Sequence, residues 1–381
     1  MKKKMLLIPL ALLLIASLIA CAAPAPAPAP APATVTAPAP APATVTAPAP
    51  APATVTAPAP TVTVTPAPAP VKVSWRLPTF EGAPDYWTVV AQREFCEAVT
   101  ERTNGNFTIT QNMKGELGIG GAEFPSALKA GVIELAHISP GYISGVMPFM
   151  GLDGQPLLMT TLDQYIDVSK GIWSIVEREW AAWGMAPLPG SFFAQTFVSL
   201  GTTEPVADLA DLNGFKVRCW NEATSRVIDT LGGVPVTMGI TEVYLSMERG
   251  IAKGALTSHP GFYDYSLHQF VKYMYTIGLG PATGYIAYNI EAYEALPKEY
   301  QDILLDESAK FGQRLYDRQP GADIGAVQSL KDAGVEFVQP SAEKMIEVKG
   351  KLTPLWEEWA EANGGAAREV LDIAYTVLGL K

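Results

Sequence analysis

The fold class is decided by one stretch, FKVRCWNEATSRVIDTLGGVPVTMGITEVYLSMERGIAKGAL, residues 215–256. Its first five residues, FKVRC, alternate apolar and charged side chains, a pattern that predicts a strand over 215–219. The residues that follow predict a helix over 221–231, a strand over 234–238, a helix over 241–249 and a strand over 251–256. Strands that alternate with helices in this way are typical of parallel sheets covered by helices. The chain therefore belongs to the α/β class.

The same alternation continues on both sides of this stretch. Toward the N-terminus the pattern predicts helices at 85–103, 123–130 and 161–183, and strands at 71–77, 107–111, 133–139, 185–188 and 193–200. Toward the C-terminus it predicts strands at 273–277, 284–289 and 335–339 within a region that is largely helical from Pro297. Residues 71–381 contain more strands and helices than one small doubly wound domain holds, so we expect two α/β lobes separated by a cleft.

The N-terminus has the order of an export signal. Lys2, Lys3 and Lys4 precede an uncharged apolar run over 5–20, which is shorter than the roughly 20 residues of a membrane-spanning helix. The run ends in Leu18-Ile19-Ala20-Cys21, which resembles the lipobox of bacterial lipoproteins. Residues 1–21 are therefore predicted to be a lipoprotein signal with acylation at Cys21. An uncleaved anchor helix and an ordinary secretory signal are the alternatives.

Residues 22–70 predict a linker rather than a domain. They are almost entirely Ala, Pro, Thr and Val, and the unit APATVTAPAP occurs at 31–40, 41–50 and 51–60. Such a segment has no large apolar side chain to bury, and frequent proline favours an extended chain. It serves either as a stalk that carries the domain away from the membrane or as a neutral spacer. The predicted solute-binding domain is then 71–381.

Composition limits the partners of this domain. Without the three signal lysines, 27 basic residues become 24 against 38 acidic ones, a net charge near −14. An acidic surface argues against nucleic acid as a partner and means that an anionic ligand needs a local positive site. Besides Cys21 there are two cysteines, Cys96 and Cys219. We expect buried free thiols, although export also permits a disulfide between them.

No catalytic pattern accompanies the predicted cleft. The three histidines, His137, His259 and His268, have neither the spacing of a helical zinc site nor a cysteine cluster beside them. There is no nucleophile elbow and no phosphate-binding loop followed by Lys-Ser/Thr. We therefore expect no enzyme activity, no metal and no cofactor.

Ligands of open α/β sheets bind at the loops that follow the strands. On this ground alone, the candidates after the first and third strands are Glu81, Tyr86, Ser139 and Tyr142. Thr257 and His259 follow the strand that ends at Leu256, where His259 is either a neutral hydrogen-bond donor to the ligand or a structural histidine.

Several motifs resemble the solute-binding subunits of TRAP transporters, the tripartite ATP-independent periplasmic carriers. They are LADLNGFKVRCWNEAT (209–224), LGGVPVTMGITEVYLSMERGIAKGA (231–255), FCEAVTERTNGNFTI (95–109) and ALKAGVIELAHISPGYISGVMPFM (127–150). The resemblance implies a two-lobed, Venus-flytrap fold with crossing strands and a long bridging helix, for which 297–318 is the candidate. Lobe I would comprise about 71–196 plus parts of 283–381, and lobe II about 197–282 plus parts of the C-terminal helices.

The resemblance also implies a ligand site. The arginine of this motif, here Arg218, would bind the carboxylate of the ligand with two parallel donors. Trp220 would form part of the cleft wall. Where many members have a second arginine this chain has Val198, and Ile240 replaces an often aromatic residue. The glutamate that ligates a metal in some relatives falls near Leu256, so we expect no metal and a monocarboxylate ligand.

By resemblance, the closed protein would deliver its solute to a membrane permease driven by an ion gradient. Two alternatives remain open at this point. One is the binding subunit of an ABC-type importer, and the other is a surface receptor or adhesion lipoprotein that carries no solute. In each case the predicted location is extracytoplasmic, with a lipid anchor at Cys21.

Overall fold

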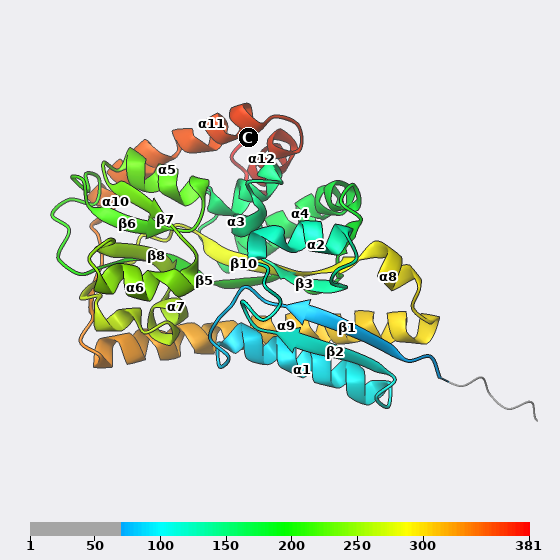
Figure 1. Ribbon diagram of the computed structural model, residues 1–381. Helices are drawn as coiled ribbons and strands as arrows, with labels where there is room; N and C mark the ends of the chain where they lie inside the picture. The colour runs from blue at the N-terminus through cyan, green and yellow to red at the C-terminus, as the bar shows by residue number, and fades with distance from the viewer. Residues whose placement is uncertain (1–69) are drawn as a thin grey trace, which may run out of the picture. The chain divides into compact units, whose positions relative to one another are not determined.

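The computed structural model describes residues 70–381, which are coloured in Figure 1. The predicted signal, with Cys21, and almost all of the predicted linker lie outside the described residues. Among the residues that are described, no helix is long and apolar enough to cross a membrane.

Two sheets form the framework. The smaller one pairs β1 (Val73–Pro78) in parallel with β2 (Phe107–Asn112). The larger one has the order β11-β9-β5-β8-β6-β7, and β10 joins it through β3, β4 and β5. Its strands are β3 (Leu135–Ile138), β4 (Met185–Pro187), β5 (Phe193–Thr202), β6 (Lys216–Cys219), β7 (Val234–Thr237), β8 (Gly254–Ser258), β9 (Tyr273–Tyr275), β10 (Pro281–Asn289) and β11 (Glu336–Val338). Every strand predicted from the sequence is present.

Two long strands connect the two parts of the larger sheet. The second half of β10 pairs with β3 and β4, and its first half pairs antiparallel with the start of β5. The remainder of β5 pairs with β8 and β9. The β6–β7–β8 group and the β3–β4 group therefore lie on opposite sides of β5 and β10 (Figure 1). This arrangement confirms the predicted crossing strands.

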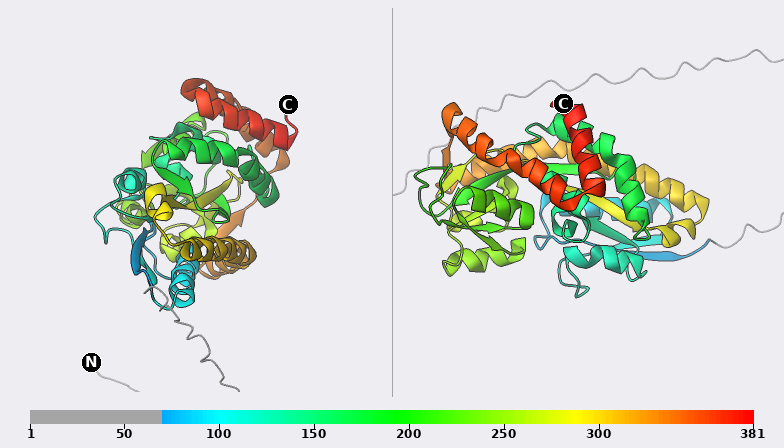
Figure 2. Two further views of the ribbon diagram at one scale, coloured as in Figure 1. Left: turned by 90° about the vertical axis from the view of Figure 1, so that its right-hand side faces the viewer. Right: turned by 90° about the horizontal axis from the view of Figure 1, so that it is seen from above.

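Helices cover both parts of the framework (Figures 1 and 2). They are α1 (Trp87–Arg102), α2 (Phe124–Lys129), α3 (Pro140–Ile143), α4 (Leu162–Ala181), α5 (Glu222–Thr230), α6 (Val243–Glu248), α7 (His259–Asp264), α8 (Ile290–Glu294), α9 (Lys298–Asp332), α10 (Ala342–Leu352), α11 (Pro354–Asn363) and α12 (Gly365–Leu378). Local chemistry explains where some of them begin. The Asn221 side chain, for example, accepts a hydrogen bond from the backbone N–H of Thr224 and so caps α5.

The bridging helix is longer than the predicted 297–318, because α9 continues through Pro320 to Asp332. Proline removes one backbone donor and usually ends or kinks a helix. Here buried side chains lie on both sides of it, with Leu315 before and Leu330 after, each 0% exposed. Packing of both halves offsets the lost hydrogen bond, so the helix continues through the proline.

Both cysteines of the described domain are buried free thiols, as expected. Cys96 lies in the core that α1 forms with Phe95, Phe107 and Phe311. Cys219 ends β6 and is 0% exposed. Burial raises the pKa of the Cys219 thiol to about 11, so it stays protonated and inert at neutral pH.

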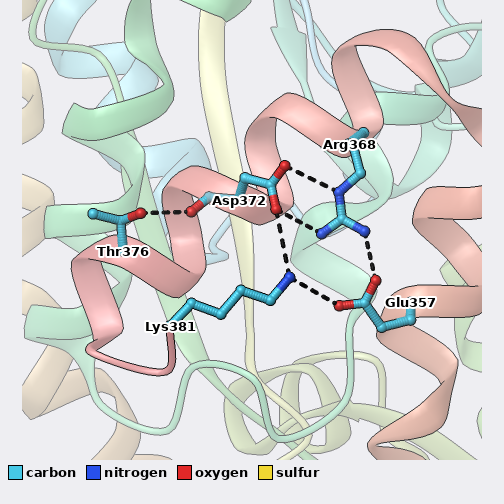
Figure 3. Close-up of polar contacts among 5 residues, drawn as sticks. All are labelled: Glu357, Arg368, Asp372, Thr376 and Lys381. Carbon is cyan, nitrogen blue, oxygen red and sulfur yellow. Dashed lines mark hydrogen bonds and ion pairs between the residues drawn. The ribbon is translucent and has the colours of Figure 1, made fainter.

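An ion cluster joins α11, α12 and the C-terminal residue (Figure 3). Arg368 donates to Glu357 and, at 2.8 Å and 3.1 Å, to the two carboxylate oxygens of Asp372. The Lys381 ammonium lies 3.4 Å from Glu357 and 3.6 Å from Asp372. The hydrogen bond from Arg368 is the main reason that the pKa of Glu357 falls to about 2. These side chains are solvent-exposed, so each pair contributes at most about 1 kcal/mol, and the cluster mainly orients the last helix.

Candidate functional site

A small cavity lies where the strands of the two parts end. Its lining comes from the residues after β1 and β3, from the ends of β6 and β8, from the loop after β7 and from the two crossing strands. The lining residues are Phe80, Glu81, Tyr86, Ser139, Tyr142, Val198, Arg218, Trp220, Ile240, Thr257, Ser258, Gly261, Tyr265 and Ala282. The cavity has a volume of about 60 Å³. One enclosed water needs roughly 10–15 Å³, so the space suits a handful of non-hydrogen atoms.

Nine of the ten candidates from the sequence line this cavity, and His259 does not. They come from segments far apart in the chain, from Glu81 to Thr257, and the fold brings them together. That these nine side chains contact a ligand stays a prediction.

His259 has other partners. Its Nε2 lies 3.0 Å from the Ser199 hydroxyl, and its Nδ1 lies 2.8 Å from a carboxylate oxygen of Asp323 on α9. Side chains alternate along a strand, so Ser199 faces away from its cavity-lining neighbour Val198. The order Ser–His–Asp is also that of a hydrolase triad, but Ser199 is only 2% exposed and does not line the cavity. The three groups tie the crossing strand β5 to α9.

Arg218 is held at the centre of three parallel strands. It pairs with Val236 of β7 and Ala255 of β8 in the ladder. Its Nε donates to the Met238 carbonyl at 3.1 Å, and its Nη1 donates to the Leu256 carbonyl at 3.0 Å. The residue is 2% exposed. Met238 follows β7 and Leu256 lies within β8, so the neighbouring strands of the sheet fix the plane of the guanidinium.

One guanidinium nitrogen remains available. Nη2 of Arg218 is buried and has no hydrogen-bond partner within residues 70–381, although the Tyr142 hydroxyl is near enough to affect the pKa of both groups. Burial lowers the pKa of Arg218, but the guanidinium keeps its charge because the ordinary pKa of arginine lies far above neutral pH. Leaving a buried charged donor unpaired costs about 1–3 kcal/mol or more. The site is therefore suited to an anion that accepts from this nitrogen.

Trp220 forms a wall beside this cation. Its ring centre lies 5.9 Å from the Arg218 guanidinium carbon, within the range of a cation–π contact. On its other side it meets the backbone of α3, because a Cβ added at Gly141 would lie 2.5 Å from the Trp220 indole nitrogen. Glycine at 141 thus permits the close approach of α3 to the end of β6.

Tyr265 is the main cavity residue that the sequence reasoning missed. It caps the C-terminus of α7, a six-residue helix that begins directly after β8 and has no apolar periodicity to reveal it. Its start does carry a signal: the Ser258 side chain accepts from the Gly261 N–H, and Pro260 occupies the first turn. Recognising that cap would have placed Tyr265 near the cavity.

A second, larger cavity of about 120 Å³ lies between α5, α11 and the segment around Gly151. Its basic residue, Arg226, is exposed and paired with Glu358. It lacks a buried charged group and strand ends, so the Arg218 cavity is the better candidate site. Within residues 70–381, no group of three or more His, Cys, Asp or Glu side chains could hold a metal ion.

Comparison with known proteins agrees with this architecture. Residues 81–363 match the family model described as bacterial extracellular solute-binding protein, family 7 (DctP). A monocarboxylate 2-oxoacid-binding periplasmic protein of a Nostoc species is 26% identical over 291 residues, which are 74% of this chain and 77% of that protein.

Solved structures share the fold. DctP6, a Bordetella pertussis extracytoplasmic solute receptor that binds pyroglutamic acid, matches with a TM-score of 0.75 and 20% identity over 80% of this chain and 100% of its own. A TRAP periplasmic solute-binding protein from Sulfitobacter, with bound galacturonate, matches with a TM-score of 0.72 and 20% identity over 79% of this chain and 98% of its own. The family model covers well over half of the chain. The chain therefore belongs to the bacterial extracellular solute-binding protein family 7, DctP, and has the two-lobed α/β fold of TRAP solute-binding proteins.

Proposed function

We propose that this protein is the solute receptor of a TRAP-type transporter and that it captures a small organic acid through Arg218. One observation supports this proposal most directly. The buried Arg218 guanidinium lines the cavity, and its Nη2 has no hydrogen-bond partner among the described residues. A carboxylate matches the charge and fork geometry of such a group, and exclusion of water strengthens the pair. The ligands named for the related structures, pyroglutamate and uronates, each contain a carboxylate.

The proposed ligand is a monocarboxylate. Among the described residues that line the cavity, Arg218 is the only basic one. A second carboxylate would meet apolar side chains such as Val198 and Ile240, or the carboxylate of Glu81, and burying an unpaired charge there is costly.

Ligand capture would depend on a hinge motion between the two parts of the domain. The two parts of the domain are joined by β5, β10 and α9, so the ligand would enter while they are apart and be enclosed as they approach. The closed form would then dock on the membrane permease of the transporter. Family membership favours this proposal over an ABC importer subunit, and the Arg218 site favours it over a surface receptor without a solute.

Identifying the co-purified ligand tests the proposal. Protein purified without added ligand is denatured, and the released small molecules are analysed by mass spectrometry. We expect an acid with one carboxylate that also raises the melting temperature of the refolded protein. A dicarboxylate would contradict the proposed ligand class. Absence of any acid, together with an unchanged melting temperature across a panel of acids, would instead favour a surface receptor.

The proposed location is the outer side of the cytoplasmic membrane, with an anchor at Cys21. We expect the wild type to fractionate with membranes and to need detergent for release, whereas Cys21→Ser leaves that fraction because its hydroxyl is not acylated. Ala22→Ser is the matched control and should stay in the membrane fraction. An equal distribution of wild type and Cys21→Ser would contradict the anchor.

A further inference from the structure

Three glycines lie where one side of the cleft contacts the other. Each belongs to the predicted lobe I and faces a residue of the predicted lobe II. An added Cβ would lie closer to that residue than the 3.4–4 Å of an ordinary van der Waals contact: 2.7 Å for Gly82 and Thr241, 2.5 Å for Gly141 and Trp220, and 2.7 Å for Gly154 and Ala223. We call these three pairs of residues the seam. Along the seam, the backbone of one side packs directly against side chains of the other.

Backbone conformation does not explain the three glycines. None of them has a φ in the left-handed region, so alanine can adopt the same backbone angles. Glycine also loses more conformational freedom on folding than alanine does, which makes it the less favourable residue wherever both fit. The close approach of the opposite side is therefore what requires glycine at the seam.

A polar contact also crosses the seam and leads to the ligand-binding arginine. The Lys114 ammonium, on the side of Gly82, donates a hydrogen bond to the Thr241 hydroxyl. Thr241 follows β7 and lies three residues after Met238, whose carbonyl accepts a hydrogen bond from Nε of Arg218. Contacts at the seam thus hold the segment that orients the guanidinium.

We infer that the seam sets how far the cleft closes and thereby determines the affinity for the ligand. Of its six residues, Trp220 alone lines the Arg218 cavity, so the other five act as positioning residues. A methyl group added at the seam would hold the two sides about 1 Å further apart, because carbon atoms pack at about 3.5–4.0 Å. Water would then reach the guanidinium and weaken its pairing with a carboxylate. The inference rests on the proposed function, since it concerns how tightly the same cleft holds its acid.

Gly82→Ala tests the first pair of the seam. We expect it to lower the affinity about tenfold, because the new methyl group would meet Cγ2 of Thr241 and disfavour the closed form. Thr241→Ser removes Cγ2 but keeps the hydroxyl that accepts from Lys114. The double variant Gly82→Ala/Thr241→Ser should therefore bind within about threefold of wild type. Calorimetry measures the affinities, with the acid released from the purified protein and L-pyroglutamate as probes.

The third pair allows a methyl group to be exchanged across the seam. Gly154→Ala should lower the affinity as Gly82→Ala does, because its Cβ would lie 2.7 Å from the Cβ of Ala223. Combining it with Ala223→Gly moves the methyl group from α5 to the opposite side and should restore the affinity to within about threefold. Gly145→Ala is the matched control and should bind like wild type, because Gly145 is exposed and an added Cβ there has no heavy atom within 4 Å.

The distance between two spin labels reports closure directly. Glu97 on α1 and Glu248 on α6 are exposed, and they belong to the predicted lobes I and II, respectively. The two cysteines of the described domain are buried, so in a Cys21→Ser chain the labels attach to Glu97→Cys and Glu248→Cys. At a saturating concentration of the acid, Gly82→Ala should give a longer distance than wild type, and Gly82→Ala/Thr241→Ser should give the wild-type distance.

Melting temperatures without added acid distinguish the inference from a purely structural role. The two sides can separate in the acid-free protein, so the single variants should melt close to wild type. A lower melting temperature with unchanged affinity would overturn the inference, as would a loss of affinity in Gly82→Ala that Thr241→Ser does not relieve. Both results leave the proposed function intact. Failure of the proposed function shows in wild type itself, because no acid would be released from it or bind to it, and the inference would then fail as well.

Discussion

Arg218→Gln is expected to reduce the affinity for the co-purified acid by at least about 100-fold. The change removes a charge-assisted hydrogen bond from the Arg218 guanidinium in a buried site, where breaking such a pair costs roughly 3–5 kcal/mol. Glutamine still donates one hydrogen bond, to the Met238 or Leu256 carbonyl, so part of the local structure is kept. Isothermal titration calorimetry measures the affinity, and the melting temperature of the variant without ligand reports on its folding.

Two further variants separate charge from geometry. Arg218→Lys keeps the charge but not the planar fork, so its affinity should fall between those of wild type and Arg218→Gln. Arg226→Gln, on the neighbouring helix α5, removes an exposed arginine that pairs with Glu358 and should bind like wild type. If Arg218→Gln binds within threefold of wild type while folded, Arg218 does not hold the carboxylate.

Gly312→Ala is expected to destabilise the domain by about 3 kcal/mol or more. Within a helix this change is ordinarily stabilising by about 1 kcal/mol, because alanine restricts the unfolded chain. Here an added Cβ would lie 1.9 Å from the Gly190 carbonyl oxygen, which belongs to the loop between β4 and β5. A backbone carbonyl cannot rotate away as a side chain can, so overpacking outweighs the gain in helix propensity. Urea unfolding followed by tryptophan fluorescence measures the change.

The same helix contains the control. Gly325 on α9 is exposed, and a Cβ added there has no heavy atom within 4 Å. Gly325→Ala should therefore stabilise the domain by up to about 1 kcal/mol. Equal unfolding midpoints for Gly312→Ala and Gly325→Ala would show that the loop moves aside at little cost. A loss confined to Gly312→Ala would establish that α9 holds the start of β5, next to Ser308, whose hydroxyl donates to the Pro189 carbonyl at 2.8 Å.

Helix and strand positions were largely predictable because they depend on local patterns. The alternation in 215–256 became β6, α5, β7, α6 and β8, with the predicted ends shifted by a few residues. One predicted end was wrong, because the candidate bridge over 297–318 continues to Asp332. Pro320 does not end α9, because Leu315 and Leu330 are buried on either side of it.

The location of the candidate site was predictable, because ligands of open α/β sheets bind near the ends of the strands. Loops after strands and the family resemblance together indicated nine side chains that line one cavity, and Arg218 was indicated by the resemblance. The direction of a side chain within such a loop was not predictable. His259 follows β8, as Tyr265 does after one short helix, yet His259 turns to Ser199 and Asp323 while Tyr265 reaches Glu81.

Sequence by itself therefore determined the α/β class, the order of the elements, the family resemblance and the arginine at the end of β6. Tertiary structure alone decided which side chains share the cavity, that two carbonyls of neighbouring strands hold the Arg218 guanidinium, and that Glu81 meets Tyr265. The physical reason is the distance along the chain over which the deciding interactions act. Backbone patterns reflect neighbours in the chain, whereas the orientation and burial of a polar group depend on partners that the fold brings from more than a hundred residues away.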